Sequence, residues 1–188
     1  MDGRLSELTL TELVASLMQD HTPRGGGTAA AIAGAMAAAM AATAVSSSQR
    51  RAAIAELEGM ESQLERLAWR LMELAEAHAG AFDALMSARH LARTDRNRDG
   101  AIGRALEATT RIPLDTAETC AEALGLLRTA RRHMPKSIWA ELNASEHLMQ
   151  GAIASAAGIV DANLPALDGS LKAEFRERLQ GASAAIAS

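Results

Sequence analysis

The sequence predicts an all-α protein, a single-domain bundle of about seven helices. The chain has 188 residues, which suits one domain and is short for two. It contains 43 alanines, and alanine is the best helix former. Tyr is absent, and the chain has two Trp, two Phe and four Pro, so the aromatic residues that strands favour and the prolines that interrupt helices are scarce. We therefore expect one helical domain over residues 1–188.

The first two helices are separated by a strong break. Apolar spacing predicts a first helix over 5–18, although Thr9 and Glu12 have capping-box spacing that would start it later. A proline followed by three glycines at 23–27 ends this helix. The alanine-rich run over 29–48 is then expected to form a long central helix, since its small side chains let neighbouring helices approach closely.

Five further helices are expected in the rest of the chain. Apolar residues at helical intervals and the turn residues between them place these helices at about 51–91, 99–110, 115–133, 137–163 and 170 to the C-terminus. Gly59 and Gly80 are weak points of the long third helix. Pro113 is expected to end the fourth helix, and Asp115 with Glu118 has the capping-box spacing that would open the fifth.

Composition excludes several classes of protein. The net charge is −4, with 19 basic and 23 acidic residues and no basic stripe, so nucleic acid is not an expected partner. The N-terminal segment lacks the pattern of a signal peptide, and the apolar run over 29–45 is short for a membrane span and mostly alanine. The single cysteine, Cys120, has no internal disulfide partner and is expected to be a buried apolar side chain. We expect a cytoplasmic protein without a membrane partner.

The segment Gly25-Gly26-Gly27-Thr28 opens the alanine-rich helix. Free backbone N–H groups and the positive end of the helix dipole can hold an anion there, and glycines let a ligand approach the backbone. The segment has neither the spacing of a dinucleotide-binding fingerprint nor the lysine of a phosphate loop. It could equally be a simple helix-to-helix turn in which Thr28 is the N-cap. Both interpretations remain open from the residues alone.

No metal site is predicted. Residues 95–102 copy the first eight positions of an EF-hand loop, but Leu106 stands where that loop needs a glutamate, and the loop arginines repel a cation. No recognised zinc spacing relates the five histidines, which are His21, His78, His90, His133 and His147.

Polar residues lie near both ends of the expected sixth helix. Glu141 and Asn143 lie near its start, and Asp161 and Asn163 near its end. A carboxylate here could do acid–base work if burial tunes it, although a surface position is the ordinary expectation for each residue alone.

The order of these features resembles the cyclodeaminase/cyclohydrolase family. That family comprises the cyclodeaminase domain of formiminotransferase-cyclodeaminase and stand-alone methenyltetrahydrofolate cyclohydrolases. The resemblance begins with a first helix, a glycine junction and an alanine-rich helix. It continues in Ala81-Phe82 to Ala88, in the Arg98, Ala101-Ile102, Ala105-Leu106 and Ile112-Pro113-Leu114 run, and in Asn163-Leu164.

Several positions depart from the family pattern. Arg24 replaces a proline, His78 an aspartate, Gly103 a glutamine, Ala140-Glu141 a Ser-Asp pair and Ile159 an asparagine. Most of the replaced residues are polar in the family and are expected to face the ligand.

The resemblance implies a homodimeric enzyme that acts on a tetrahydrofolate derivative and uses no metal or cofactor. The implied reaction is hydrolysis of 5,10-methenyltetrahydrofolate to 10-formyltetrahydrofolate, or cyclisation of formiminotetrahydrofolate with loss of ammonia. It places Glu141 beside the substrate cation and makes His78 a proton shuttle. The implied substrate-binding residues are Arg24, Gly25, Gly26, Gly27, Thr28, Arg98 and Asn163. The departures leave two alternatives open, a non-catalytic relative that binds a folate-like or other small anion, and a helical partner-binding protein.

Overall fold

The computed structural model describes residues 5–19 and 25–187, and within them every regular element is a helix. The elements are, in order, η1 Leu5–Glu7, α1 Leu10–Leu17, α2 Gly26–Arg51, η2 Ala55–Leu57, α3 Met60–His90, α4 Arg98–Arg131, η3 Lys136–Ile138, α5 Trp139–Asn163, η4 Leu164–Ala166 and α6 Gly169–Ala187. The all-α prediction is confirmed.

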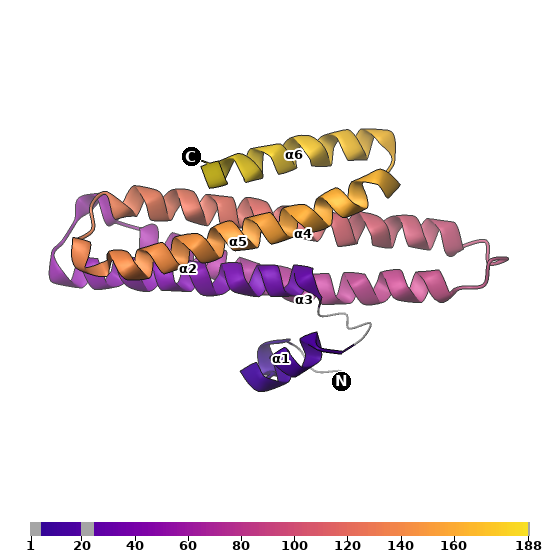
Figure 1. The fold of residues 1–188 in the computed structure, drawn as a ribbon, viewed down its shortest axis with the longest axis horizontal. Helices are drawn as coiled ribbons and strands as arrows, with labels where there is room; N and C mark the ends of the chain where they lie inside the picture. The colour runs from indigo at the N-terminus through magenta and orange to yellow at the C-terminus, as the bar shows by residue number, and fades with distance from the viewer. Residues whose placement is uncertain (1–4, 20–24, 188) are drawn as a thin grey trace.

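The long helices α2, α3, α4 and α5 form the bundle (Figure 1). Each packs mainly against its two neighbours in the cyclic order α2, α3, α4, α5, and α2 also contacts α4 across the centre. Helix α6 lies across α4 and α5, whereas α1 lies to one side of the bundle (Figure 1). The hairpin of α3 and α4 extends beyond the start of α2 (Figure 1). The start of α2 therefore lies partway along α3 and not at the end of the bundle.

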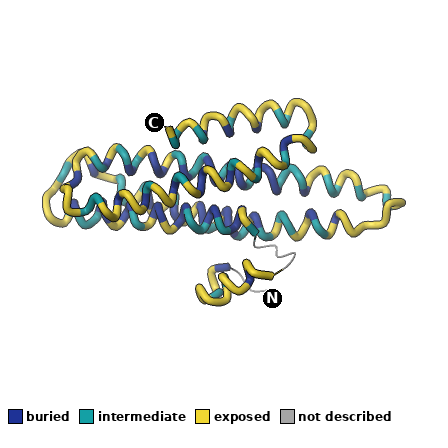
Figure 2. Tube along the Cα trace, viewed as in Figure 1, coloured by how far each residue is buried: buried dark blue, intermediate teal, exposed yellow. Residues whose placement is uncertain are grey.

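Helix α2 is the close-packed centre that its alanines predict. Its buried face consists of alanine, glycine and small polar residues together with Val45, and this face lies in the interior seen in Figure 2. At Gly34 an added methyl group would collide with Sγ of Cys120 on α4 and lie 3.3 Å from Leu71 on α3. Cys120 is fully buried, as expected, and desolvation raises the pKa of its thiol to about 12.

Helix α2 is also long and apolar enough to cross a membrane, judged by length and composition. However, 61% of its most apolar 18-residue stretch is buried in the fold, which is the pattern of a core helix.

The first helix begins at the later of the two predicted positions. Oγ1 of Thr9 accepts a hydrogen bond from the Glu12 amide at 3.3 Å, and the Glu12 carboxylate accepts from the Thr9 amide at 2.8 Å. The bond from the Thr9 amide, together with one that the Thr9 hydroxyl donates to the same carboxylate at 2.8 Å, lowers the pKa of Glu12. The continuous helix predicted over 5–18 is therefore wrong. Residues Leu5–Glu7 form the separate 3-10 helix η1, and the capping box starts α1 after it.

The predicted boundary between the second and third helices is wrong. Helix α2 continues through its serines to Arg51, and Ser48 Oγ donates to the Ala44 carbonyl at 3.0 Å without ending the helix. The chain then turns at Gly59, which has a φ of 74° and precedes the first residue of α3. Gly80 lies inside α3, where an added methyl group would meet nothing within 4 Å.

The predicted break at Pro113 is also wrong, because α4 runs through it. A proline cannot donate to the carbonyl four residues earlier, which here belongs to Thr109. Nδ2 of Asn163, on α5, donates to that carbonyl at 3.4 Å and replaces the missing donor. Two predicted helices therefore merge, and the described chain has six α-helices in place of about seven.

The capping box expected after Pro113 does not exist either. Asp115 and Glu118 lie within α4 and bind Arg178 of α6, at 2.8 Å and 2.7 Å. Both carboxylates raise the pKa of the Arg178 guanidinium, which desolvation opposes. The ring of Phe175 is fully buried below Arg178, so this cluster fixes α6 on the bundle.

Candidate functional site

The glycine junction forms the head of α2 and packs directly on α3. Gly25 is the N-cap and supplies no side-chain cap, so the alternative in which Thr28 caps the helix is wrong. Thr28 is instead fully buried, with Oγ1 3.4 Å from Nδ1 of His78 and 3.5 Å from the Ala75 carbonyl. The side chain of Thr28 thus faces α3 and not the end of its own helix.

The third glycine is required by the ring of His78. A methyl group added at Gly27 would lie 2.6 Å from two ring carbons, with Nε2 as the nearest atom of all. An added methyl group at Gly26 would meet only Ile159 Cδ1, at 3.8 Å, and one at Gly25 would meet nothing within 4 Å. The glycine at this position therefore permits close packing of α2 on α3, which a turn alone does not need.

The environment of His78 favours its neutral form. The residue is 6% exposed, and desolvation lowers the pKa of its imidazole from 6.5. Thr28 Oγ1 can donate to the Ala75 carbonyl while it accepts from a protonated Nδ1. This hydrogen-bond assignment leaves Nε2 unprotonated on the side that faces Gly27, where it can accept a proton.

Helix α5 closes the other side of the junction. Ile159 contacts Gly26, and a groove of about 430 Å³ runs from this contact between α2 and α5. Its lining is mostly apolar, with His147 and Ser155 as the polar members. Asn163 lies one helical turn beyond Ile159, bonded to the Thr109 carbonyl. The described residues of α2, α3, α4 and α5 thus converge on the head of α2.

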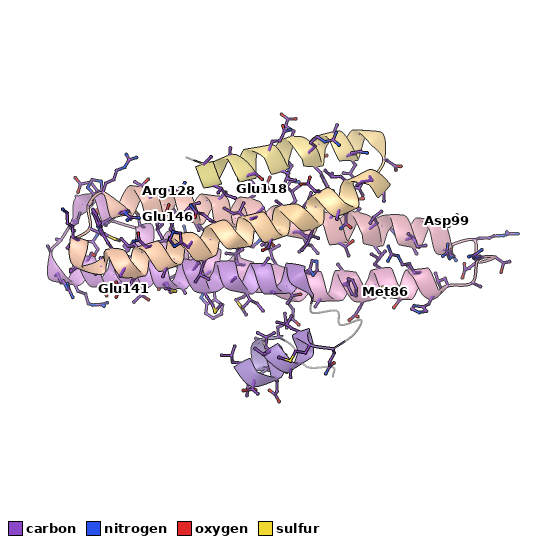
Figure 3. The ribbon with its side chains drawn as sticks, in the orientation of Figure 1. Met86, Asp99, Glu118, Arg128, Glu141 and Glu146 are labelled. Atoms are coloured by element: carbon purple, nitrogen blue, oxygen red, sulfur yellow. The ribbon has the colours of Figure 1, made fainter. Side chains whose placement is uncertain are left out.

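Glu141 lies towards the other end of α2. It is exposed and lines a groove of about 530 Å³ with Ala44, Ser47 and Arg51. The rise of an α-helix places Ala44 about 24 Å from Thr28 along α2. Figure 3 shows Glu141 at one end of the bundle and Asp99 at the other. A single chain therefore does not bring Glu141 and His78 together.

Arg98, one of the two predicted arginines, lies far from the cluster. Arg98 starts α4, where its Nε donates to the Leu91 carbonyl at 3.2 Å and Nη1 lies 3.6 Å from Asp99. Leu91 is about 20 Å from His78 along α3. Arg24 lies outside the described residues.

The EF-hand look-alike forms a short turn. Oδ1 of Asp95 accepts a hydrogen bond from the Asn97 amide at 2.8 Å, just before α4 begins. Within residues 5–19 and 25–187, no three His, Cys, Asp or Glu side chains are grouped to hold a metal ion.

Sequence reasoning missed two features. The bond between Asn163 and Thr109 was signalled by Pro113, since a proline inside a helix leaves a carbonyl that needs another donor. Trp69 is 72% exposed in a groove of about 680 Å³ between α2 and α3. Its signal in the sequence was an aromatic residue among charged ones, next to Arg70 and one turn from Glu65 and Glu73.

The comparisons with known proteins agree with the fold. The solved structure of formiminotetrahydrofolate cyclodeaminase from Thermotoga maritima is similar to this chain with a TM-score of 0.88 and 20% sequence identity. The match covers 97% of this chain and 91% of that one. A search of curated protein sequences found no significant match. The family described as formiminotransferase-cyclodeaminase matches residues 9–181. Because this match spans nearly the whole chain, the protein belongs to the formiminotransferase-cyclodeaminase family.

Proposed function

We propose that this protein is an enzyme of folate one-carbon metabolism. It hydrolyses 5,10-methenyltetrahydrofolate to 10-formyltetrahydrofolate, or it cyclises formiminotetrahydrofolate with loss of ammonia. Family membership and the shared fold support this reaction class. The observation that carries the proposal is the ring of His78, packed under the glycine junction, where burial lowers its pKa and favours the neutral form. Both reactions need a proton acceptor near neutral pH.

In the hydrolysis, water adds to the amidinium carbon and loses a proton to a base. The bond from that carbon to N5 then breaks, N5 takes up a proton, and one proton is released overall. In the cyclisation, N10 attacks the formimino carbon, loses its proton, and the protonated formimino nitrogen leaves as ammonia. In this proposal Nε2 of His78 accepts the proton in the first step. The carboxylate that stabilises the cationic carbon is Glu141 of the partner subunit in the proposed homodimer, because a single chain holds Glu141 far from His78.

Substrate binding is proposed at the head of α2. The N–H groups of the first helical turn have no carbonyl partner within the helix, and they favour an anionic or carbonyl group of the substrate. Arg24 and Arg98 are proposed charge partners of the folate carboxylates, and Asn163 completes the binding set from α5.

An absorbance assay tests the proposal. Purified protein should accelerate the loss of methenyltetrahydrofolate absorbance over buffer, or should form that absorbance and ammonia from formiminotetrahydrofolate. His78→Gln should reduce the rate about 100-fold with retained helicity. Glu122→Gln, on the exposed face of α4, is the matched control and should match wild type. Folded protein with rates equal to buffer on both substrates would contradict an enzymatic role.

A non-catalytic relative is the second candidate, and one contact favours it. Ile159 covers Gly26 where the family pattern has an asparagine, so an expected polar group is missing beside the junction. Saturable binding of a folate by calorimetry, without turnover, would identify this function.

The remaining expectations are also proposals. The family resemblance supports a homodimer, and the cytoplasmic location stays a prediction.

A further inference from the structure

The hairpin of α3 and α4 extends beyond the other two helices of the bundle (Figure 1). Helix α2 begins level with His78. Helix α5 ends at Asn163, which bonds to the Thr109 carbonyl of α4. Residues 79–90 of α3 and 98–108 of α4 therefore lie beyond both α2 and α5 and pack mainly on each other. Two helices alone leave much of their apolar surface uncovered.

A groove of about 520 Å³ runs along one side of this hairpin, and we call it the hairpin groove. Its two walls each follow the spacing i, i+3, i+4, i+7, which is the spacing of a helix face that packs inside a bundle. Ala88 and Ala105, in the middle of the walls, are buried. Five of the eight wall residues are alanine: Ala84, Ser87, Ala88 and Leu91 on α3, and Ala101, Arg104, Ala105 and Ala108 on α4.

The walls of the hairpin groove fit a third helix. Small side chains let a helix approach closely, and the larger side chains of that helix fill the space between the walls. Each wall extends over about 11 Å, which is two helical turns. Within residues 5–19 and 25–187 no helix occupies the groove, since α6 packs on α4 and α5. The hairpin therefore presents two sides of a three-helix packing whose third helix is missing.

Helix α6 shows what covers an outward surface of α4 elsewhere in this fold. It packs Phe175 and Leu179, one turn apart, into a small core with residues of α4 and α5. Beside these apolar residues its Arg178 binds Asp115 and Glu118 of α4. The covering helix is thus amphipathic, and its charge is opposite to that of the α4 residues it meets.

The tip of the hairpin is positively charged. The segment 89–104 contains five arginines and two aspartates, a net charge of +3, whereas the whole chain carries −4. The ion pair of this segment in the described structure joins Arg98 to Asp99 at 3.6 Å. Figure 3 shows Asp99 at this end of the molecule, far from Glu141. A cationic tip on an acidic protein attracts an acidic partner.

Arg104 brings this positive charge into the hairpin groove. It lines the α4 wall, and its Nη1 would lie 3.4 Å from a methyl group added at Gly100, so the guanidinium extends towards the tip. Arg93 and Arg96 are exposed at the tip itself. These three arginines make no ion pair within the residues that the structure describes. An apolar groove bordered by unpaired cations complements a helix that carries carboxylates beside its apolar residues.

We propose that the hairpin groove binds an acidic amphipathic helix of another protein. The partner helix packs its apolar side chains between the two alanine-rich walls and places carboxylates over Arg104 and the tip. A contact of two helical turns is smaller than a standard interface, so the complex is a transient one of micromolar affinity. The proposal does not depend on the proposed function, because Ser87 and Leu91 lie about 140° or more around α3 from His78.

The first test measures binding of two model peptides. The probe is a fluorescein-labelled helical peptide of 18 residues, with leucine at the spacing i, i+3, i+4, i+7 and glutamate on both flanks. The full chain should bind it saturably at micromolar concentration, and a peptide with lysine for every glutamate at least about tenfold more weakly, by fluorescence anisotropy. Arg104→Glu should weaken the glutamate peptide at least about tenfold. Arg176→Glu, on the exposed side of α6, changes the net charge equally and should bind as wild type.

The second test locates the contact. Ser87→Cys, coupled to an environment-sensitive fluorophore, should shift its emission to the blue when the glutamate peptide binds, because the label enters an apolar contact. Ser170→Cys, exposed on α6, is the matched control and should show no shift. Cys120 is buried and does not take up the label.

Four results would overturn the proposal. The first is no saturable binding, and the second is equal affinity for the two peptides. The third is tighter binding of a single-stranded oligonucleotide of equal charge, lost in Arg104→Glu, which would assign the groove to nucleic acid. The fourth is self-association of the full chain in sedimentation equilibrium that Arg104→Glu abolishes, which would assign the groove to a second copy.

Discussion

The two ends of α2 differ in what fixes their residues. At the head, Gly27 and Thr28 are buried against the ring of His78, so steric fit determines which side chain is possible. At the other end, Ser47 and Arg51 border an open groove with Glu141, where many side chains would fit. The resemblance assigned functional residues at the head of α2 and, with Glu141 of α5, beside its other end. Within a single chain, only the residues at the head of α2 are packed together, whereas the other end borders an open groove.

The largest effect on stability should follow from Gly27→Ala. The added methyl group would overlap the ring of His78, and either the ring or α2 must shift. Overpacking of this kind costs about 2 kcal/mol, which lowers the melting temperature by about 6 °C in a chain of this length. Thermal unfolding followed by circular dichroism measures it.

The control for Gly27→Ala is Gly26→Ala, which should be neutral or slightly stabilising. Its methyl group has ordinary space beside Ile159, and alanine is the better helix former. The double variant G27A/H78A should lose less than the sum of the single losses, because the smaller side chain makes room. If the losses of the two single variants simply add in the double variant, the methyl group at position 27 does not meet the ring of His78.

Asn163→Ala tests the head from the side of α5. It removes the donor to the Thr109 carbonyl, which Pro113 leaves without its usual partner, and should cost about 1 kcal/mol. Urea denaturation of the variant and of wild type provides the measurement. In a Pro113→Ala background the backbone N–H returns, so the same substitution should cost less. If Asn163→Ala costs the same free energy of unfolding in both backgrounds, the side chain of Asn163 does not replace the backbone N–H that is missing at Pro113.

The pH dependence of stability tests the burial of His78 at the head of α2. Burial lowers the pKa of His78 below 6.5, so the folded state binds a proton less readily than the unfolded state. The contribution of His78 to the free energy of unfolding is fully present above pH 6.5 and decreases as the pH falls below that value. It becomes constant below the lowered pKa. The slope is at most about 1.4 kcal/mol per pH unit. Denaturation of wild type and His78→Gln between pH 5 and 8 should show this slope in wild type alone.

The smallest effect on stability is expected at the open end of α2. Glu141 is exposed and has no hydrogen bond or ion pair within the described residues, so Glu141→Ala should change the unfolding free energy by less than about 0.5 kcal/mol. Under the proposed function the same variant should reduce kcat about 100-fold. Unchanged kcat in an active enzyme would remove Glu141 from the catalytic set and leave the head as the site.

The sequence predicted the features that local physics decides. Alanine content and apolar periodicity predicted the all-α bundle, and the spacing of Thr9 and Glu12 predicted the capping box of α1. The burial of Cys120 followed from its chemistry as a small apolar side chain without a disulfide partner.

Contacts between distant residues decided what the sequence could not predict. The break at Pro113 failed because the compensating donor, Asn163, comes from another helix. The tight fit of Gly27 against His78 joins positions 51 residues apart, which no local pattern reveals. The distance between His78 and Glu141 follows from the antiparallel packing of α2 with its neighbours.

The contact between Gly34 and Cys120 has a consequence for experiments on this protein. The thiol is fully buried at the crossing of α2 and α4, and its pKa of about 12 keeps it protonated at neutral pH. A thiol reagent can react with the wild-type chain only after the central helices separate, because the thiolate is the reactive form. The rate of labelling therefore reports how often the bundle opens, and Cys120 serves as a natural probe of native-state dynamics without any substitution.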